Sequence, residues 1–113
     1  MARVEIVQSL KDEVLKKLKK DSKTMFRLMQ SLGENPQRGK TLSTVAGIVI
    51  KELKYKNFRF YFVTDGFKLK CMGEKELVDL LLRFVRMSDK KHQQKTINEI
   101  KNVLQTLGPM GFK

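Results

Sequence analysis

The sequence predicts an α+β domain in which helices pack on one face of an antiparallel β-sheet meander. Three observations support this class: segments of alternating apolar residues gather in the middle of the chain, an amphipathic helical pair precedes them, and another amphipathic helix follows them. Consecutive strands joined by tight turns form an antiparallel sheet, and helices cover its apolar side. With 113 residues the chain can build one hydrophobic core, so residues 1–113 are expected to form a single domain. The expected order of elements is β-α-α-β-β-β-(β)-α.

The N-terminal third is expected to contain a strand and a helical hairpin. Residues 2–8 alternate between apolar and polar side chains, which predicts a strand. Ser9 has a residue type that caps helices, and a second helix is expected to end at Gly33. The apolar stripes consist of Leu10, Val14 and Leu18 in the first helix and of Met25, Met29 and Leu32 in the second. This spacing predicts that both helices place one face on the sheet.

The central strands are expected to follow a loop. Residues 35–47 are polar and rich in chain-breaking residues, which predicts the loop. A strand beginning at Gly47 is expected to pair with Phe58–Thr64. The Asp-Gly dipeptide at 65–66 is a strong hairpin signal, so Phe67–Met72 is expected to be the third strand of the meander.

The C-terminal part begins with an ambiguous segment. Residues 74–87 fit a helix or a buried strand, and periodicity alone does not decide between them. We favour a turn at Gly73–Lys75 and then a strand that ends near Met87. Ser88-Asp89 can cap a final helix, which Gly108-Pro109 ends; its apolar stripe is Ile97, Ile100, Leu104 and Leu107. With helices expected on one face, the other face of the sheet is expected to be open.

The charge predicts a polyanionic partner. The chain has 24 Lys and Arg against 12 Asp and Glu, a formal net charge of +12, and nucleic acid is the first candidate for so basic a domain. One cysteine, Cys71, expected in a strand, and one histidine cannot supply a zinc site. The lone cysteine, together with the lack of a signal-peptide pattern or a membrane-length apolar run, predicts a cytoplasmic protein that does not enter a membrane.

The stretch Lys51–Phe62 has the densest positive charge. Its cations are Lys51, Lys54, Lys56 and Arg59, opposed only by Glu52. Alternation puts Phe58, Phe60 and Phe62 on one face of the second strand and Arg59, Tyr61 and Val63 on the other. Such a strand can bury one face and offer the other to a polyanion. A half-buried strand whose solvated face happens to be basic explains the same pattern.

The order of these motifs resembles the RelE/ParE superfamily of toxins from toxin–antitoxin systems. The N-terminal strand and helical hairpin come first. NPQRG followed by Leu42 is similar to the family's Asn-Pro-x-x-Gly loop, and FRFYFV before Asp-Gly is similar to its Tyr-Arg-hydrophobic-x-Tyr strand. FVRMSDKK leads into the final helix and is similar to the family's Phe-x-Lys-Lys-Ser ending. The resemblance covers nearly the whole chain.

The resemblance implies a function and partners. RelE- and HigB-like members are ribosome-dependent mRNA interferases, the toxins of type II systems, and cut mRNA in the ribosomal A site without a metal or cofactor. The ribose 2′-OH attacks the adjacent phosphate, which requires a base, cations for the developing charge and a proton for the leaving oxygen. The implied partners are the ribosome, mRNA and a small acidic antitoxin, which the net charge also favours.

The resemblance also implies site residues. Arg59 matches the strand arginine that contacts the phosphate, and Arg86 matches the second arginine. Lys51 and Lys54 lie where the family has lysines, but alternation sends them to opposite faces and we prefer Lys54. His92 lies where some members have a general base or acid, and the alternative interpretation is a solvated residue at the start of a basic helix. The implied RNA-binding residues are Lys51, Lys56, Tyr61, Arg83, Lys90 and Lys91. Arg59 and Arg86 are expected to be exposed and to contribute little to stability.

Three other functions remain open. A degenerate toxin of this fold would bind RNA or antitoxin without catalysis. A ParE-type protein would inhibit DNA gyrase, but that branch does not need the cations at Lys54 and Arg59. The third open function is that of a generic basic RNA-binding domain. Against it, the chain lacks the paired aromatic motif of an RRM-like sheet.

Overall fold

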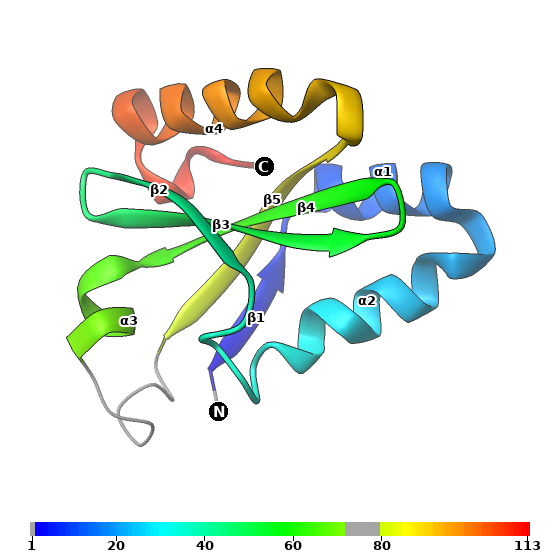
Figure 1. Cartoon of the computed structure of the whole chain (residues 1–113), viewed down its shortest axis with the longest axis horizontal. Coiled ribbons are helices and arrows are strands. Elements are labelled where there is room, and N and C mark those ends of the chain that lie inside the picture. Colours follow the sequence, from blue (N-terminus) through cyan, green and yellow to red (C-terminus); the bar gives the residue numbers. More distant parts are fainter. Residues whose placement is uncertain (1, 72–79) are drawn as a thin grey trace.

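A computed structural model describes residues 2–71 and 80–113 and shows the expected α+β class (Figure 1). The elements run in the order β1 (Arg3–Ile6), α1 (Gln8–Leu18), α2 (Ser22–Ser31), β2 (Lys40–Val45), β3 (Ile48–Tyr55), β4 (Phe58–Asp65), α3 (Gly66–Cys71), β5 (Leu81–Asp89) and α4 (Gln93–Leu107). Short 3₁₀ helices cover Lys19–Asp21, Lys90–His92 and Pro109–Gly111. No helix among these is long and apolar enough to cross a membrane.

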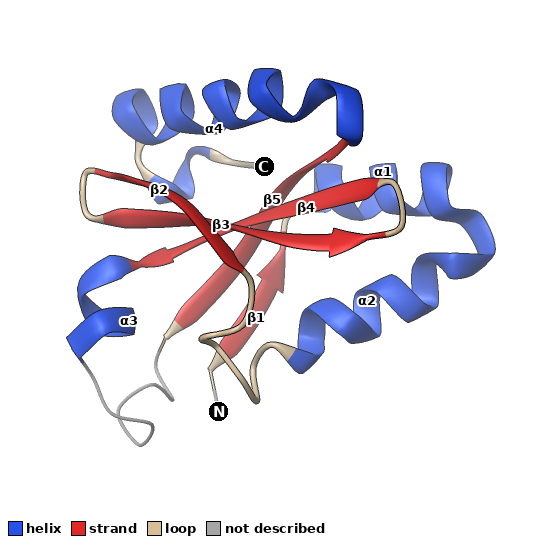
Figure 2. Cartoon of the chain, in the orientation of Figure 1, coloured by secondary structure: helices blue, strands red, loops and turns tan. Residues whose placement is uncertain are grey.

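The strands form one five-stranded sheet in the order β1-β5-β4-β3-β2 (Figure 2). The pairs β2–β3, β3–β4 and β4–β5 are antiparallel, and the β3–β4 pair is the one that the sequence predicts. β1 pairs in parallel with β5, with Arg3 opposite Leu81. Strands paired in parallel cannot be joined by a tight turn, and here everything between β1 and β5 in the chain forms the connection.

The N-terminal hairpin covers one face of the sheet. The predicted stripes of α1 and α2 are buried, with Val14, Met25 and Met29 fully inaccessible. The phenylalanines of β4 and β5 lie on this face, where the rings of Phe62 and Phe84 are 4.7 Å apart between centroids. Periodicity therefore predicted this layer correctly, because a helix or strand with one apolar face must bury that face.

The opposite face is not open, which corrects the expectation from the sequence. Helix α4 and the C-terminal residues cover it, and Figure 1 shows α4 and the α1–α2 pair on different sides of the strands. Ile100, Leu104 and Phe112 are buried in this second layer. Arg83, which projects from β5 on this side, donates from Nη2 to the Phe112 carbonyl oxygen at 2.8 Å. The apolar stripe of α4 needs a surface to cover, and the second face of the sheet provides it.

Two local predictions are wrong. Residues 66–71 form helix α3 and not a strand, so Cys71 lies exposed on a helix. Asp65 explains the difference, because its Oδ1 accepts the backbone N–H of Lys68 at 3.0 Å in a helix cap, whereas we interpreted the Asp-Gly pair as a hairpin turn. Residues 40–45 of the predicted loop form β2, a polar edge strand.

The hairpin between β2 and β3 turns at Ala46-Gly47. Both residues have positive φ, 51° and 81°, which suits the mirror-image turns that join tightly twisted strands. A strand that begins at Gly47 is therefore approximately confirmed by β3, which starts at Ile48.

The C-terminal predictions are largely confirmed, except that Leu107 of the predicted α4 stripe is 69% exposed. β5 ends at Asp89, near the predicted Met87, so the strand interpretation holds for its described residues. The predicted turn at Gly73–Lys75 and the rest of 72–79 lie outside the described residues. Asp89 caps the 3₁₀ turn that leads into α4, and α4 ends before Gly108 as the sequence predicts.

Candidate functional site

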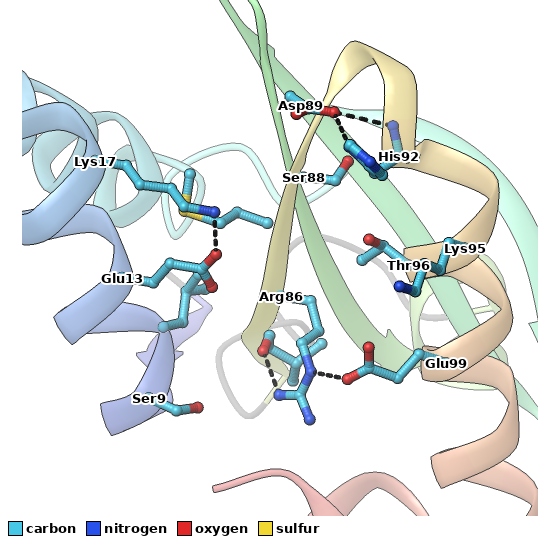
Figure 3. A pocket seen from close by; sticks show the side chains of 13 residues that line it. Ser9, Glu13, Lys17, Arg86, Ser88, Asp89, His92, Lys95, Thr96 and Glu99 are labelled. Atoms are coloured by element: carbon cyan, nitrogen blue, oxygen red, sulfur yellow. Dashed lines mark hydrogen bonds and ion pairs between the residues drawn. The ribbon is translucent and has the colours of Figure 1, made fainter.

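A groove of about 440 Å³ follows the outer half of β5 between α1 and α4, and we name it the β5 groove (Figure 3). It exists because β1 pairs only with residues 81–84 of β5, so residues 85–89 have no strand neighbour on that side within the described chain. Polar and charged side chains line it: Ser9, Glu13, Lys17, Arg86, Ser88, Asp89, His92, Lys95, Thr96 and Glu99. Of the four predicted catalytic residues, Arg86 and His92 lie here.

His92 is held by Asp89 at the upper end of the β5 groove (Figure 3). The Oδ1 atom of Asp89 lies 2.7 Å from His92 Nδ1 and also accepts the His92 backbone N–H at 2.9 Å. The side-chain hydrogen bond from His92 lowers the pKa of Asp89. The imidazole is 63% exposed, and its Nε2 atom has no hydrogen-bond partner in the part of the chain that the structure describes. A carboxylate that orients an accessible imidazole is an arrangement suited to proton transfer.

Arg86 lies lower in the same groove, and protein groups occupy its guanidinium. Its Nε is 2.6 Å from Glu99 Oε1, its Nη1 donates to the Val85 carbonyl oxygen at 2.7 Å, and its guanidinium carbon lies 5.1 Å from the centre of the Phe112 ring. The side chain is 25% exposed, so Arg86 is only partly accessible and the expectation of an exposed arginine is wrong. Glu99 competes with a phosphate for this guanidinium, and Nη2 is the nitrogen that has no hydrogen-bond partner among the described residues.

A second hollow, of about 430 Å³, contains the other two predicted catalytic residues, and we name it the β3 hollow. It is lined by Arg38, Gly39, Lys40, Glu52, Leu53, Lys54, Arg59 and Gln93. Lys54 is exposed there. Arg59 is buried and its Nε forms an ion pair with Glu52 Oε1 at 3.0 Å, with side chains only 7% and 9% exposed. The expectation that Arg59 is an exposed arginine is therefore also wrong.

The two hollows lie on either side of the start of α4. His92 borders the β5 groove and the next residue, Gln93, borders the β3 hollow. Across the strands, Lys54 is opposite Arg59, and Arg59 is opposite Ser88. The four predicted catalytic residues therefore lie in one region of the sheet, but the first turn of α4 divides them into two pairs.

The predicted RNA-binding residues differ in how accessible they are. Lys90 and Lys91 are exposed in the 3₁₀ turn. Lys56 is exposed, and its Nζ forms an ion pair with Asp21 at 2.9 Å, which raises the pKa of Lys56. Lys51 is 2% exposed on the face opposite Lys54, as alternation predicts, and β3 has no bulge in its pairing with β4.

Tyr61 and Arg83 are buried and do not reach the surface as RNA ligands. The Tyr61 hydroxyl forms a 2.8 Å hydrogen bond with Ser88 Oγ, and burial raises the pKa of Tyr61. Arg83 pairs with Glu5 at 3.0 Å. Their expected role in RNA binding requires an open sheet face, and α4 with the C-terminal residues covers that face.

Sequence reasoning missed several residues of the two hollows. Asp89 is predicted from the sequence only as a helix cap, although its Asp-x-x-His spacing also indicates a carboxylate–imidazole pair. Arg38 and Lys40 were assigned to a loop, and only the folded chain brings them beside Lys54. Lys95 and Glu99 follow His92 at helical spacing and so share its side of α4.

The structure shows no group of three or more His, Cys, Asp or Glu residues that could hold a metal among residues 2–71 and 80–113. Comparisons with protein-family models, curated proteins and solved structures found no match.

Proposed function

We propose that this protein is a metal-independent endoribonuclease that cleaves RNA by 2′-OH attack at the β5 groove. The observation that carries the proposal is the exposed His92 imidazole, oriented by Asp89 at the edge of a groove that also contains cationic side chains. The net charge of +12 supports a polyanionic substrate. The resemblance of the motifs to RelE-like toxins supports ribosome-bound mRNA as that substrate.

The chemistry assigns one role to each group. Nε2 of His92 accepts the proton of the ribose 2′-OH, and Asp89 holds the imidazole in position and stabilises it once protonated. The 2′-oxygen attacks the adjacent phosphorus, the bond to the 5′-oxygen breaks, and the products are a 2′,3′-cyclic phosphate and a 5′-OH end. Lys95 supplies positive charge near the phosphate. Solvent reaches this open groove and supplies the proton for the leaving oxygen.

The proposed biological role is that of a toxin in a type II toxin–antitoxin system in the cytoplasm. A small acidic antitoxin would then neutralise it, because a free domain with so large a positive charge favours a complementary partner. Purification of the protein from its native host should recover such a partner in near-equal amount. Recovery of the protein alone, or only with DNA gyrase, would contradict this role.

A direct test is cleavage of mRNA on programmed ribosomes with analysis of the RNA ends. We expect 2′,3′-cyclic phosphate and 5′-OH ends, and no cleavage when the nucleotide at the cut carries a 2′-O-methyl group. Cleavage of the methylated RNA, or products with a 5′-phosphate, would contradict the proposed chemistry. A His92→Gln control excludes a contaminating ribonuclease.

A second candidate function is RNA binding without catalysis. The observation that favours it is that carboxylates hold both arginines that the resemblance assigns to the phosphate: Glu52 holds Arg59 and Glu99 holds Arg86. This candidate predicts tight, salt-dependent binding of mRNA that stays intact in the ribosome assay. The two candidates therefore differ in a single measured quantity, the amount of cleaved RNA.

A further inference from the structure

The buried Lys51 ammonium holds a loop in place and does not face solvent. Its Nζ donates to the Gln37 carbonyl oxygen at 2.9 Å and lies 5.8 Å from the centre of the Phe62 ring. In the described chain this ammonium has no carboxylate partner. Since burying an ammonium costs free energy unless hydrogen bonds compensate, a lysine at this position needs a local reason.

The loop that Lys51 contacts is fixed at several points. Gln37 donates from Nε2 to the Leu69 carbonyl oxygen of α3 at 2.8 Å. Gly39 follows with a φ of +100°, and a Cβ built there would lie 3.0 Å from Cζ of Phe62. Lys40 then begins β2, opposite Glu52. The Lys51 amine, the Phe62 ring and the pairing of β2 with β3 therefore define the path of residues 37–40.

Arg38 is the residue that this path presents to the β3 hollow. It lines the hollow together with Lys40 and Lys54, and all three side chains are exposed. The carboxylate in the hollow, Glu52, is already paired with the buried Arg59. Three accessible cations therefore surround the hollow without an accessible carboxylate among its lining residues.

We propose that Arg38 binds a phosphodiester of the RNA strand beside the cleavage site, and that Lys51 is the positioning residue that holds Arg38 there. The inference rests on the proposed function in taking the ligand to be single-stranded RNA. An RNA that crosses the start of α4 passes from the β5 groove to the β3 hollow, since adjacent residues of that turn border the two. The N-terminal end of a helix favours the phosphate that crosses it.

The distance between the two hollows suits a short RNA segment. β5 and β2 are the first and last of four adjacent strands, so they are about 14 Å apart at roughly 4.8 Å per strand spacing. A few nucleotides span this distance. Lys51 thus contributes to RNA binding from the opposite face of the sheet, although it cannot itself touch the RNA.

The test measures binding of an RNA oligonucleotide that is 2′-O-methylated throughout, so that catalysis plays no part. Arg38→Ala should weaken binding on the order of tenfold and lower the salt slope by about one unit, as expected for one lost phosphate contact. Arg27→Ala removes an exposed arginine of α2 and is the charge-matched control. Lys51→Met keeps the buried stem and removes the ammonium, and it should weaken binding to a similar extent.

The double variant of Arg38→Ala with Lys51→Met separates positioning from direct contact. If Lys51 acts only through Arg38, the double variant binds no more weakly than Arg38→Ala alone. Trypsin should also cut the folded Lys51→Met protein faster after Arg38. Gly39→Ala provides a second route that leaves Lys51 intact, because the added Cβ displaces the same loop. The double variant of Gly39→Ala with Arg38→Ala should bind RNA no more weakly than Arg38→Ala alone.

Each contrary outcome identifies what fails. If wild type does not bind the methylated RNA, this inference is overturned, whereas the proposed function is overturned only when mRNA on programmed ribosomes is not cleaved. If wild type binds and Arg38→Ala matches Arg27→Ala, the inference alone is overturned. Additive losses for Arg38→Ala and Lys51→Met overturn the positioning role. Weakened binding of an acidic protein partner with unchanged RNA affinity would show that the β3 hollow is a protein-binding site, which also overturns the inference.

Discussion

Glu99 of α4 holds the guanidinium of Arg86: the two side chains meet at 2.6 Å between Nε and Oε1. The Val85 carbonyl oxygen and the Phe112 ring contact other parts of the same guanidinium, so Arg86 is turned toward α4, with its side chain 25% exposed. A strand arginine in the β5 groove is thus restrained by a carboxylate on the opposite wall of that groove.

Glu99→Gln should strengthen RNA binding. The change removes the carboxylate that competes with phosphate for Arg86, so the salt slope of binding should increase by about one unit. Glu34→Gln removes an equal charge from an exposed position outside both hollows and is the control. The measurement is a titration of 2′-O-methylated RNA at several salt concentrations. Equal effects of the two variants would mean that only net charge matters and that Arg86 is not restrained.

Arg59→Met should destabilise the fold strongly, contrary to what an exposed arginine would do. It leaves the carboxylate of Glu52 buried without its partner, and breaking a buried pair in this way costs about 3–5 kcal/mol. The double variant with Glu52→Leu removes both charges and should recover most of that loss. Urea denaturation of the three proteins checks this. A single variant as stable as wild type would show that Glu52 reaches solvent.

Lys51→Met should change how stability depends on alkaline pH. Burial lowers the pKa of Lys51 below its ordinary value of 10.5, so the unfolded chain keeps this proton to a higher pH than the folded chain. Between the lowered pKa and 10.5 the unfolded state binds more protons, and the stability contributed at this position rises with pH. Wild type should therefore gain free energy of unfolding relative to Lys51→Met across this window. A constant difference between the two proteins would contradict a buried, titrating amine.

The helices and the central strands could be predicted because each has a repeating apolar pattern. Leu10, Val14 and Leu18 repeat every four residues, and burial of one helical face follows from that spacing. Strand β2 has no such pattern, since an edge strand with polar residues such as Thr41 and Ser43 has the composition of a loop. Asp65 illustrates a different limit, because one residue type serves both hairpin turns and helix caps.

The candidate site could be predicted only in part, because its division into two hollows depends on which face of the sheet α4 covers. The stripe of α4 predicts burial but does not say against which surface. With α4 packed over this face of the sheet, Arg59 and Tyr61 are buried and Arg86 meets Glu99. By contrast, the proximity of Asp89 and His92 depends only on their spacing of three residues in a turn, and a sequence can show that directly.

The most direct test of the account is the pH dependence of single-turnover mRNA cleavage on programmed ribosomes, measured for wild type, His92→Gln and Asp89→Asn. The wild-type rate should fall as the pH is lowered, because a protonated imidazole cannot accept the proton of the 2′-OH. His92→Gln should lower the rate on the order of 10²–10⁴-fold and abolish this acidic limb. Asp89→Asn, whose amide oxygen can still accept the His92 backbone N–H, should slow cleavage while the fold stays intact. If His92→Gln keeps both the wild-type rate and its acidic limb, His92 is only a solvated residue at the start of α4, and the proposed active site is wrong.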